Sequence, residues 1–165
     1  MRLNLSVFIF YFCIVGCSNT DQRQQIEIPP SFVSNDTSDG KQFIAILKPD
    51  AEFKTIELTK ADLKLIDDLL NEAVNGFNER QEKRRRAGDT FGSFIDLKKY
   101  KRQYIPQENK NGTREVWVNC FCRSHDDKKW KNEIVMVMDG GSCFFNLKIN
   151  LTKKQYLIFS VNGLA

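Results

Sequence analysis

The chain has 165 residues, of which 41% are hydrophobic and 28% are charged, and its formal net charge at pH 7 is +4. This length suits one domain and is short for two. The positive charge is mild, so we expect basic clusters such as residues 83–86 to be solvated surface and predict no nucleic-acid partner.

The first sixteen residues have the pattern of a secretory signal peptide. Arg2 precedes an apolar run that closes on Ile14-Val15-Gly16-Cys17, and the run is short for a membrane span. Those last four residues resemble the lipobox of bacterial lipoproteins, as found in small exported lipoproteins. The resemblance implies that Cys17 becomes the lipidated first residue of the mature chain. It would anchor the protein, with palmitate among its acyl groups, to a lipid bilayer of the cell envelope, and the outer membrane is the expected location. The alternatives are an ordinary signal peptide cut nearby and an uncleaved anchor.

A polar segment, residues 17–40, is expected to be a flexible tether. Ser, Asn, Thr, Asp and Gln predominate in it, together with Pro29-Pro30, and such a composition cannot bury enough apolar surface to fold alone. The predicted organisation is therefore a signal peptide at 1–16, a lipidated tether at 17–40 and a single α+β domain at 41–165.

Two short apolar runs open the predicted domain, at residues 43–47 and 53–58. The turn-prone Lys48-Pro49-Asp50 separates them. We expect two short strands here, which a hairpin would join.

A long amphipathic helix is predicted next. Thr59 suits the N-cap position, and Asp62, three residues on, can take the place of the usual acidic residue of a capping box. Apolar residues then recur at helical spacing and give the helix one apolar face: Leu63, Ile66, Leu70, Ala73 or Val74, and Phe77. We expect the helix to fray in the charged run 79–86 and to end by Gly88.

From residue 100 the pattern changes to the alternation that is typical of strands. The predicted strands are 100–105, 115–122, 133–138, 143–151 and 155–161, with a strong turn at Asp139-Gly140-Gly141-Ser142. A helix followed by hairpin-linked strands predicts the α+β class, with one long amphipathic helix packed on an antiparallel β-meander of about four or five strands. This layout resembles the cystatin-like group.

The predicted register places three cysteines. If Met138 lies opposite Cys143 and the strand 133–138 separates Cys143 from Cys120, the two cysteines are about 16 Å apart, at ~3.3 Å per residue and ~4.8 Å per strand. A disulfide needs Cα atoms within about 7 Å, so buried free thiols are expected. A disulfide from Cys143 to Cys120 or Cys122 is the alternative, because an exported protein meets oxidising conditions. The C-x-C spacing is a weak signal for a metal, and none is predicted.

A thiol enzyme would need Cys122 beside His125, which is the only histidine of the chain. The histidine falls in a polar loop, and the predicted register turns the thiol into the core. We therefore predict no catalytic residue, no cofactor and no enzymatic activity, and keep this dyad as an alternative.

The face of the sheet that the helix does not cover is predicted to carry an apolar patch. Its members are Trp117, Phe121, Val135, Val137 and Phe144. The hairpin at 43–58 or a second copy would cover it in one interpretation, whereas an open apolar patch with an aromatic anchor is typical of a binding surface. The sequence thus predicts a non-catalytic binding or interaction module for an unknown protein or small ligand. Its oligomeric state is open, and an enzyme inhibitor or immunity-type protein is the alternative.

Overall fold

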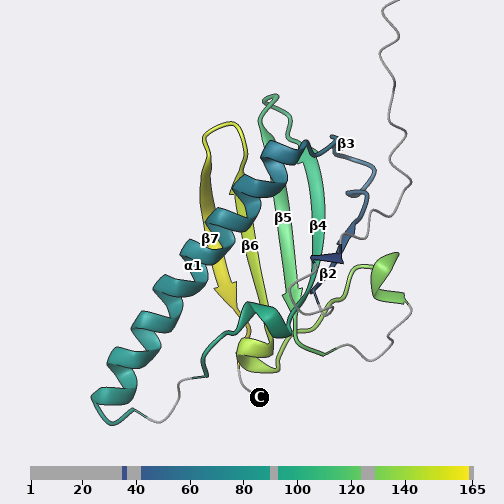
Figure 1. Ribbon diagram of the computed structural model, residues 1–165. Helices are drawn as coiled ribbons and strands as arrows, with labels where there is room; N and C mark the ends of the chain where they lie inside the picture. The colour runs from purple at the N-terminus through teal and green to yellow at the C-terminus, as the bar shows by residue number, and fades with distance from the viewer. Residues whose placement is uncertain (1–34, 37–41, 90–92, 124–128, 164–165) are drawn as a thin grey trace, which may run out of the picture.

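The protein folds as one long helix laid across one face of a twisted sheet (Figure 1). The computed structural model describes residues 35–36, 42–89, 93–123 and 129–163. The α+β class predicted from the sequence is confirmed, and the arrangement is consistent with a cystatin-like layout. The predicted signal peptide and all of the predicted tether except residues 35–36 lie outside the described residues.

In chain order, the elements are β1 (Asn35–Asp36), β2 (Gln42–Ile46), β3 (Lys54–Thr55), α1 (Lys60–Arg86), η1 (Leu97–Lys99), β4 (Lys101–Glu108), β5 (Arg114–Phe121), η2 (Lys129–Lys131), η3 (Gly141–Cys143), β6 (Phe144–Asn150) and β7 (Gln155–Val161). The strands lie in the order β1-β2-β4-β5-β6-β7, and β3 also pairs with β4. Because β2 runs parallel to β4, the sheet is mixed and not the purely antiparallel meander that was predicted.

The predicted hairpin of residues 43–47 and 53–58 is wrong, because both runs pair with β4 instead of with each other. Pro106 explains how one edge serves two short strands. The backbone of Tyr104 faces this edge, since its carbonyl accepts from Leu47 N at 2.9 Å, and by alternation that of Pro106 does too. Proline has no N–H to donate, and Pro106 lies between the part of β4 that pairs with β2, which ends at Tyr104, and the part that pairs with β3, which is Gln107 and Glu108.

The predicted start of α1 is confirmed by its hydrogen bonds. Asp62 N donates to Thr59 Oγ1 at 3.1 Å, and Thr59 N donates to Asp62 Oδ2 at 2.9 Å, which completes a capping box. Arg114 Nη2 also donates to Asp62 Oδ2, at 2.8 Å, so the cap is tied to β5. Burial alone would raise the pKa of Asp62, but the hydrogen bonds from Arg114 and Thr59 lower it below its ordinary value.

The predicted apolar face of α1 is also confirmed, and it forms the larger core with the sheet. Ile66, Leu70, Ala73 and Val74 are buried, and Leu69 joins them. Facing them, Val116, Val118 and Cys120 of β5 lie opposite Ile149, Leu147 and Phe145 of β6, and all six are buried. The helix ends at Arg86, before Gly88 as expected, but the predicted fraying in the run 79–86 is wrong, because those residues are helical.

The predicted strand at 133–138 is wrong, because β5 pairs directly with β6. In the last hairpin, Leu147 lies opposite Phe159 and Phe145 opposite Val161. A bulge shifts the register by one residue beyond Lys148, so Ile149 lies opposite Tyr156.

Leu70→Ala should lower the free energy of unfolding by about 2–5 kcal/mol, because Leu70 is wholly buried under α1 and its loss leaves a cavity. Chemical denaturation of the purified protein measures this. Leu157→Ala is the matched control, because this leucine is exposed on β7, and it should cost less than about 1 kcal/mol. Equal costs at the two positions would contradict the packing of α1.

Candidate functional site

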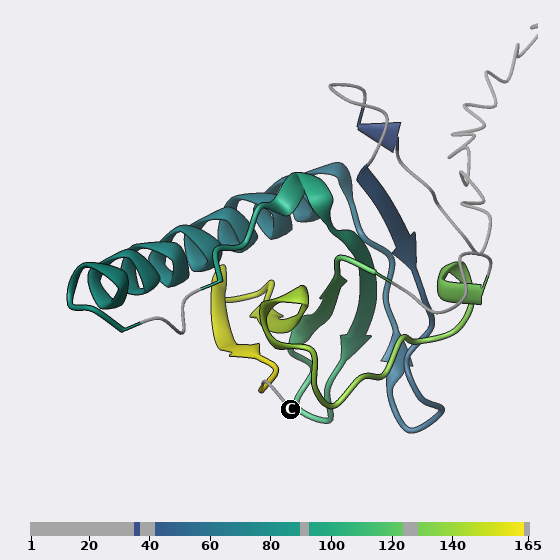
Figure 2. The ribbon, with the colours of Figure 1, turned by 90° about the horizontal axis from the view of Figure 1, so that it is seen from below.

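The sheet face opposite α1 is crossed by an irregular segment, residues 129–139, that we call the strap. Figure 2 shows it on the side of the sheet away from α1, running toward the end of β7. Ile134, Val135 and Val137 pack against the sheet, whereas Met136 and Met138 are 73% and 91% exposed. From Val135 onward, buried and exposed side chains therefore do alternate, as they would in the predicted strand. The buried side chains, however, contact the face of the sheet and not a neighbouring strand.

Buried side-chain amides hold the strap in place. Gln103 of β4 is fully buried, and its Nε2 donates to the carbonyl oxygens of Trp130 and of Glu133, the latter at 2.7 Å. Its Oε1 accepts from Val135 N at 3.0 Å and from Asn119 Nδ2 at 2.9 Å. The amide thus uses both donors and both lone pairs.

Two further amides continue this pairing along the strap. Asn119 Nδ2 donates to Val135 O at 2.8 Å, and Asn162 Nδ2, just beyond β7, donates to Val137 O at 2.6 Å. The backbone of the strap therefore finds on side chains the partners that a strand would find on a neighbouring strand. Sequence reasoning missed Gln103, Asn119 and Asn162 in this role, although polar residues at inward positions of a strand are a signal that could have been noticed.

The five residues of the predicted patch come together, but in a second core. Phe121 and Phe144 are buried, while Trp117, Val135 and Val137 are half-buried and pack against them. The strap closes this core with Trp130, and β2 closes it with Ala45 and Leu47. Phe121 and Phe144 therefore cannot touch a partner in this structure, whereas Trp117, Val135 and Val137 stay partly accessible.

Cys122 and Cys143 form a disulfide, with their Cα atoms 5.0 Å apart. The expectation of free thiols is right for Cys120, which is fully buried, and wrong for these two. The cause is the direct pairing of β5 with β6, which places Phe121 opposite Phe144 and so brings the two cysteines next to each other. The alternative dyad has no free thiol at Cys122 in this state, and His125 lies outside the described residues.

A cationic side chain is buried between α1 and the sheet. Arg102 Nη1 donates to Asp67 Oδ1 at 3.1 Å, and Arg102 also bonds Tyr104. Burial raises the pKa of Tyr104 to about 12, and burial likewise raises that of the Cys120 thiol to about 12, although the charge of Arg102 lowers both. All three side chains are almost completely covered, so this cluster offers no access to a substrate.

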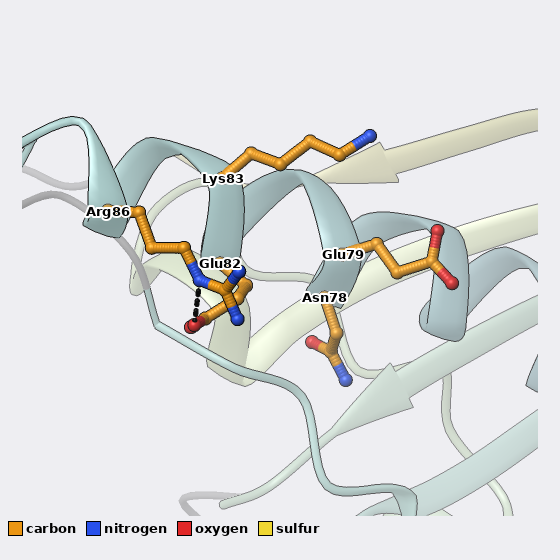
Figure 3. A pocket seen from close by; sticks show the side chains of 5 residues that line it. All are labelled: Asn78, Glu79, Glu82, Lys83 and Arg86. Carbon is orange, nitrogen blue, oxygen red and sulfur yellow. Dashed lines mark hydrogen bonds and ion pairs between the residues drawn. The ribbon is translucent and has the colours of Figure 1, made fainter.

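A surface hollow of about 390 Å³ lies along the last turns of α1 (Figure 3). Its lining residues are Asn78, Glu79, Glu82, Lys83 and Arg86. Glu82 receives hydrogen bonds from Arg85 and Arg86, each at 2.8 Å, and these lower its pKa to about 2. Glu82 and Arg86 of the hollow are therefore already paired on the helix. Within the described ranges, no three side chains of metal-ligating type gather at one point.

Most of the exposed large apolar side chains lie at the β7 side of the molecule. Tyr156, Leu157 and Ile158 are exposed on β7 itself, and Met136 and Met138 flank Val137, which is bonded to Asn162 at the end of β7. Ile158 lies beside Lys148, and Lys148 beside Trp117, in one row across three strands. On the strap face, Ile158, Trp117 and the strap methionines are therefore the apolar side chains that stay at least partly exposed, with the charged Lys148 between Ile158 and Trp117.

No protein family, no curated protein and no solved structure matches the chain. Among the residues that the structure describes, no helix has the length and apolar character needed to cross a membrane.

Gln103→Leu should lower the free energy of unfolding by at least about 2 kcal/mol, because the new side chain has nearly the same size but leaves buried polar groups of the strap and of Asn119 without partners. Chemical denaturation measures the loss, and limited proteolysis should show faster cleavage between residues 129 and 139. Asn71→Leu is the control, since that amide is exposed on α1; it should change stability by less than about 0.5 kcal/mol. An unchanged Gln103→Leu protein would contradict the role of the amide.

Proposed function

We propose that the protein is a membrane-tethered lipoprotein of the bacterial cell envelope whose α+β domain is a non-catalytic binding module. The disulfide between Cys122 and Cys143 carries this proposal. Structural disulfides persist in exported proteins and are rare in the reducing cytosol. The disulfide therefore supports the same compartment as the lipobox-like Ile14-Val15-Gly16-Cys17, although the two features are far apart in the chain.

The kind of surface on the domain supports binding as its activity. The exposed apolar side chains gather at β7 and on the strap instead of being scattered, and such gathering is typical of contact surfaces. Trp117 is half-buried beside this region and can present part of its indole ring as an aromatic anchor. A protein or a small apolar ligand is the partner class that this surface fits.

Trapping of thiols in intact cells tests the compartment. Cys122 and Cys143 should resist alkylation until a reductant is added, and Cys120 should react once the protein is denatured, because it is free and buried. Peptide mapping by mass spectrometry reads out each position. Alkylation of Cys122 and Cys143 without reductant, in protein freshly trapped from cells, would count against export.

Cys17→Ala should release the protein from membranes without unfolding the domain, because Cys17 lies in the predicted tether, far along the chain from both cores. Membrane fractionation measures the attachment, and resistance of the domain to proteolysis reports the fold. Cys13→Ala, four residues earlier and outside the lipobox-like motif, is the control and should leave attachment intact. Attachment that survives Cys17→Ala would show that this residue is not the anchor.

A further inference from the structure

The hairpin that joins β6 to β7 carries an uninterrupted run of exposed residues, 152–158, that we call the tip. It lies at the same end of the sheet as the start of α1 (Figure 1). Two lysines occupy its turn, and three large apolar residues follow on β7 with 38% to 56% of their surface exposed: Tyr156, Leu157 and Ile158. Cationic and apolar side chains are therefore adjacent at one end of the molecule.

The apolar side chains of the tip emerge on both faces of the sheet. Ile158 lies opposite Lys148 and so shares the strap face, whereas Tyr156 lies opposite Ile149, which is buried on the α1 face. The bulge leaves Leu157 without a partner between them. A folded partner docked on one face would leave the other face in water, whereas the fluid interface of a bilayer can surround both.

The charge of the tip is positive. Residues 140–165 contain no aspartate or glutamate, and Lys153 and Lys154 are exposed in the turn. Glu115 of β5 lies in register with the base of the hairpin, but Lys148 Nζ bonds its carboxylate at 2.9 Å. The tip therefore complements the phosphates of anionic lipid.

Lys154 has a backbone conformation that lysine rarely adopts. Its φ is 52°, in the left-handed region that glycine usually occupies in three-residue hairpin loops. A glycine or asparagine would complete the same turn with less strain, so the turn itself gives no reason for a lysine. A strained residue in an exposed turn is consistent with a task for its side chain, and contact with an anion is a task that an exposed ammonium group can perform.

The outer edge of β7 sets the depth of such a contact. No described strand pairs with this edge, and backbone polar groups without partners do not enter the hydrocarbon of a bilayer. At the level of the headgroups, water and phosphate oxygens can accept hydrogen bonds from the edge. There the lysine stems reach the phosphates and the apolar side chains reach the boundary of the acyl chains.

We propose that the tip docks on the anionic phospholipid surface of the membrane to which the chain is tethered. Lys153 and Lys154 bind the lipid phosphates, and Tyr156, Leu157 and Ile158 lie at the boundary of the acyl chains. The rest of the strap face is left free for the partner of the binding module.

This inference rests on the proposed function, since the tether is what brings the domain to a bilayer. Residues 18–34 separate Cys17 from β1 and reach at most about 60 Å. The width of the sheet from β1 to β7 is about 24 Å, at ~4.8 Å per strand. The tether is therefore long enough for the β7 edge to meet the same membrane. The contact is weak without the anchor, so Cys17→Ala still releases the protein from cell membranes.

Vesicle flotation tests the contact in the absence of a lipid anchor. The protein is the mature-length chain, residues 17–165, with Cys17→Ala and the disulfide formed; it keeps every described residue, so both cores are complete. At low salt it should float with vesicles that contain phosphatidylglycerol and not with vesicles of phosphatidylcholine alone.

Two substitutions in the tip should each weaken binding to the anionic vesicles about fivefold or more. Lys154→Gly removes one cationic group, and thermal stability should not fall, because glycine adopts the left-handed conformation without strain. Ile158→Asp replaces an exposed apolar side chain with an anion. Lys98→Ala and Met138→Asp are the matched controls, because each makes the same change of charge at an exposed position outside the tip, and they should change binding less than about twofold.

Absence of flotation with the anionic vesicles overturns the proposal. Equal losses in all four variants also overturn it, because binding would then follow net charge and not the tip. If the chain does not float but Ile158→Asp abolishes recovery of an envelope protein, the tip contacts a protein and not lipid. Anchoring is measured separately by Cys17→Ala in cells, so failure of the tip and failure of the proposed function give different results.

Discussion

A primary amide in the interior of the sheet, that of Gln103, must be fully paired, and the strap satisfies this requirement. A buried amide without partners would cost several kcal/mol, so the backbone of residues 130–135 is held where its carbonyls and N–H can meet Gln103. That position in turn puts Trp130, Val135 and Val137 over the face of the sheet. The second core, the route to Cys143 and the exposure of Met136 and Met138 all depend on it.

The sequence predicts the features of the fold that depend on neighbouring residues, but not the position of the strap. The start of α1, its apolar face and the inward residues of β5 and β6 follow from spacing and capping over a few residues, and these predictions are confirmed. The strand at 133–138 was wrong because alternation reports only that one side of a segment is buried. It does not tell whether the burial is against a neighbouring strand or against the face of a sheet.

The sequence predicts which residues form the candidate site, but not which of them are exposed. Trp117, Phe121, Val135, Val137 and Phe144 do gather, since residues of the same parity on paired strands share a face. What covers them depends on long-range contacts from β2 and the strap, which no local pattern encodes. The distance that argued against a disulfide was wrong for the same reason, because it counted a strand between β5 and β6 that the structure does not have.

The two edges of the described sheet differ in what they are joined to. The predicted tether leads into β1 and β2 at one edge, whereas β7 lies at the other. The unpaired edge is therefore separated from the chain's entry point by the full width of the sheet. A contact made at β7 would therefore leave the edge that carries β1 and β2 free.

The disulfide also has a consequence for the order of events during maturation. Three thiols, those of Cys120, Cys122 and Cys143, allow three pairings, and only one of them is found. Cys120 is withdrawn from oxidants when β5 is buried under α1, and the pairing of Phe121 with Phe144 then leaves Cys122 and Cys143 adjacent. The sheet register thus acts as a template for oxidation. If the chain were oxidised before β5 and β6 have paired, the geometry would not favour Cys122 over Cys120 as the partner of Cys143. A Cys120–Cys143 bond would draw β5 out of the core that it forms with α1.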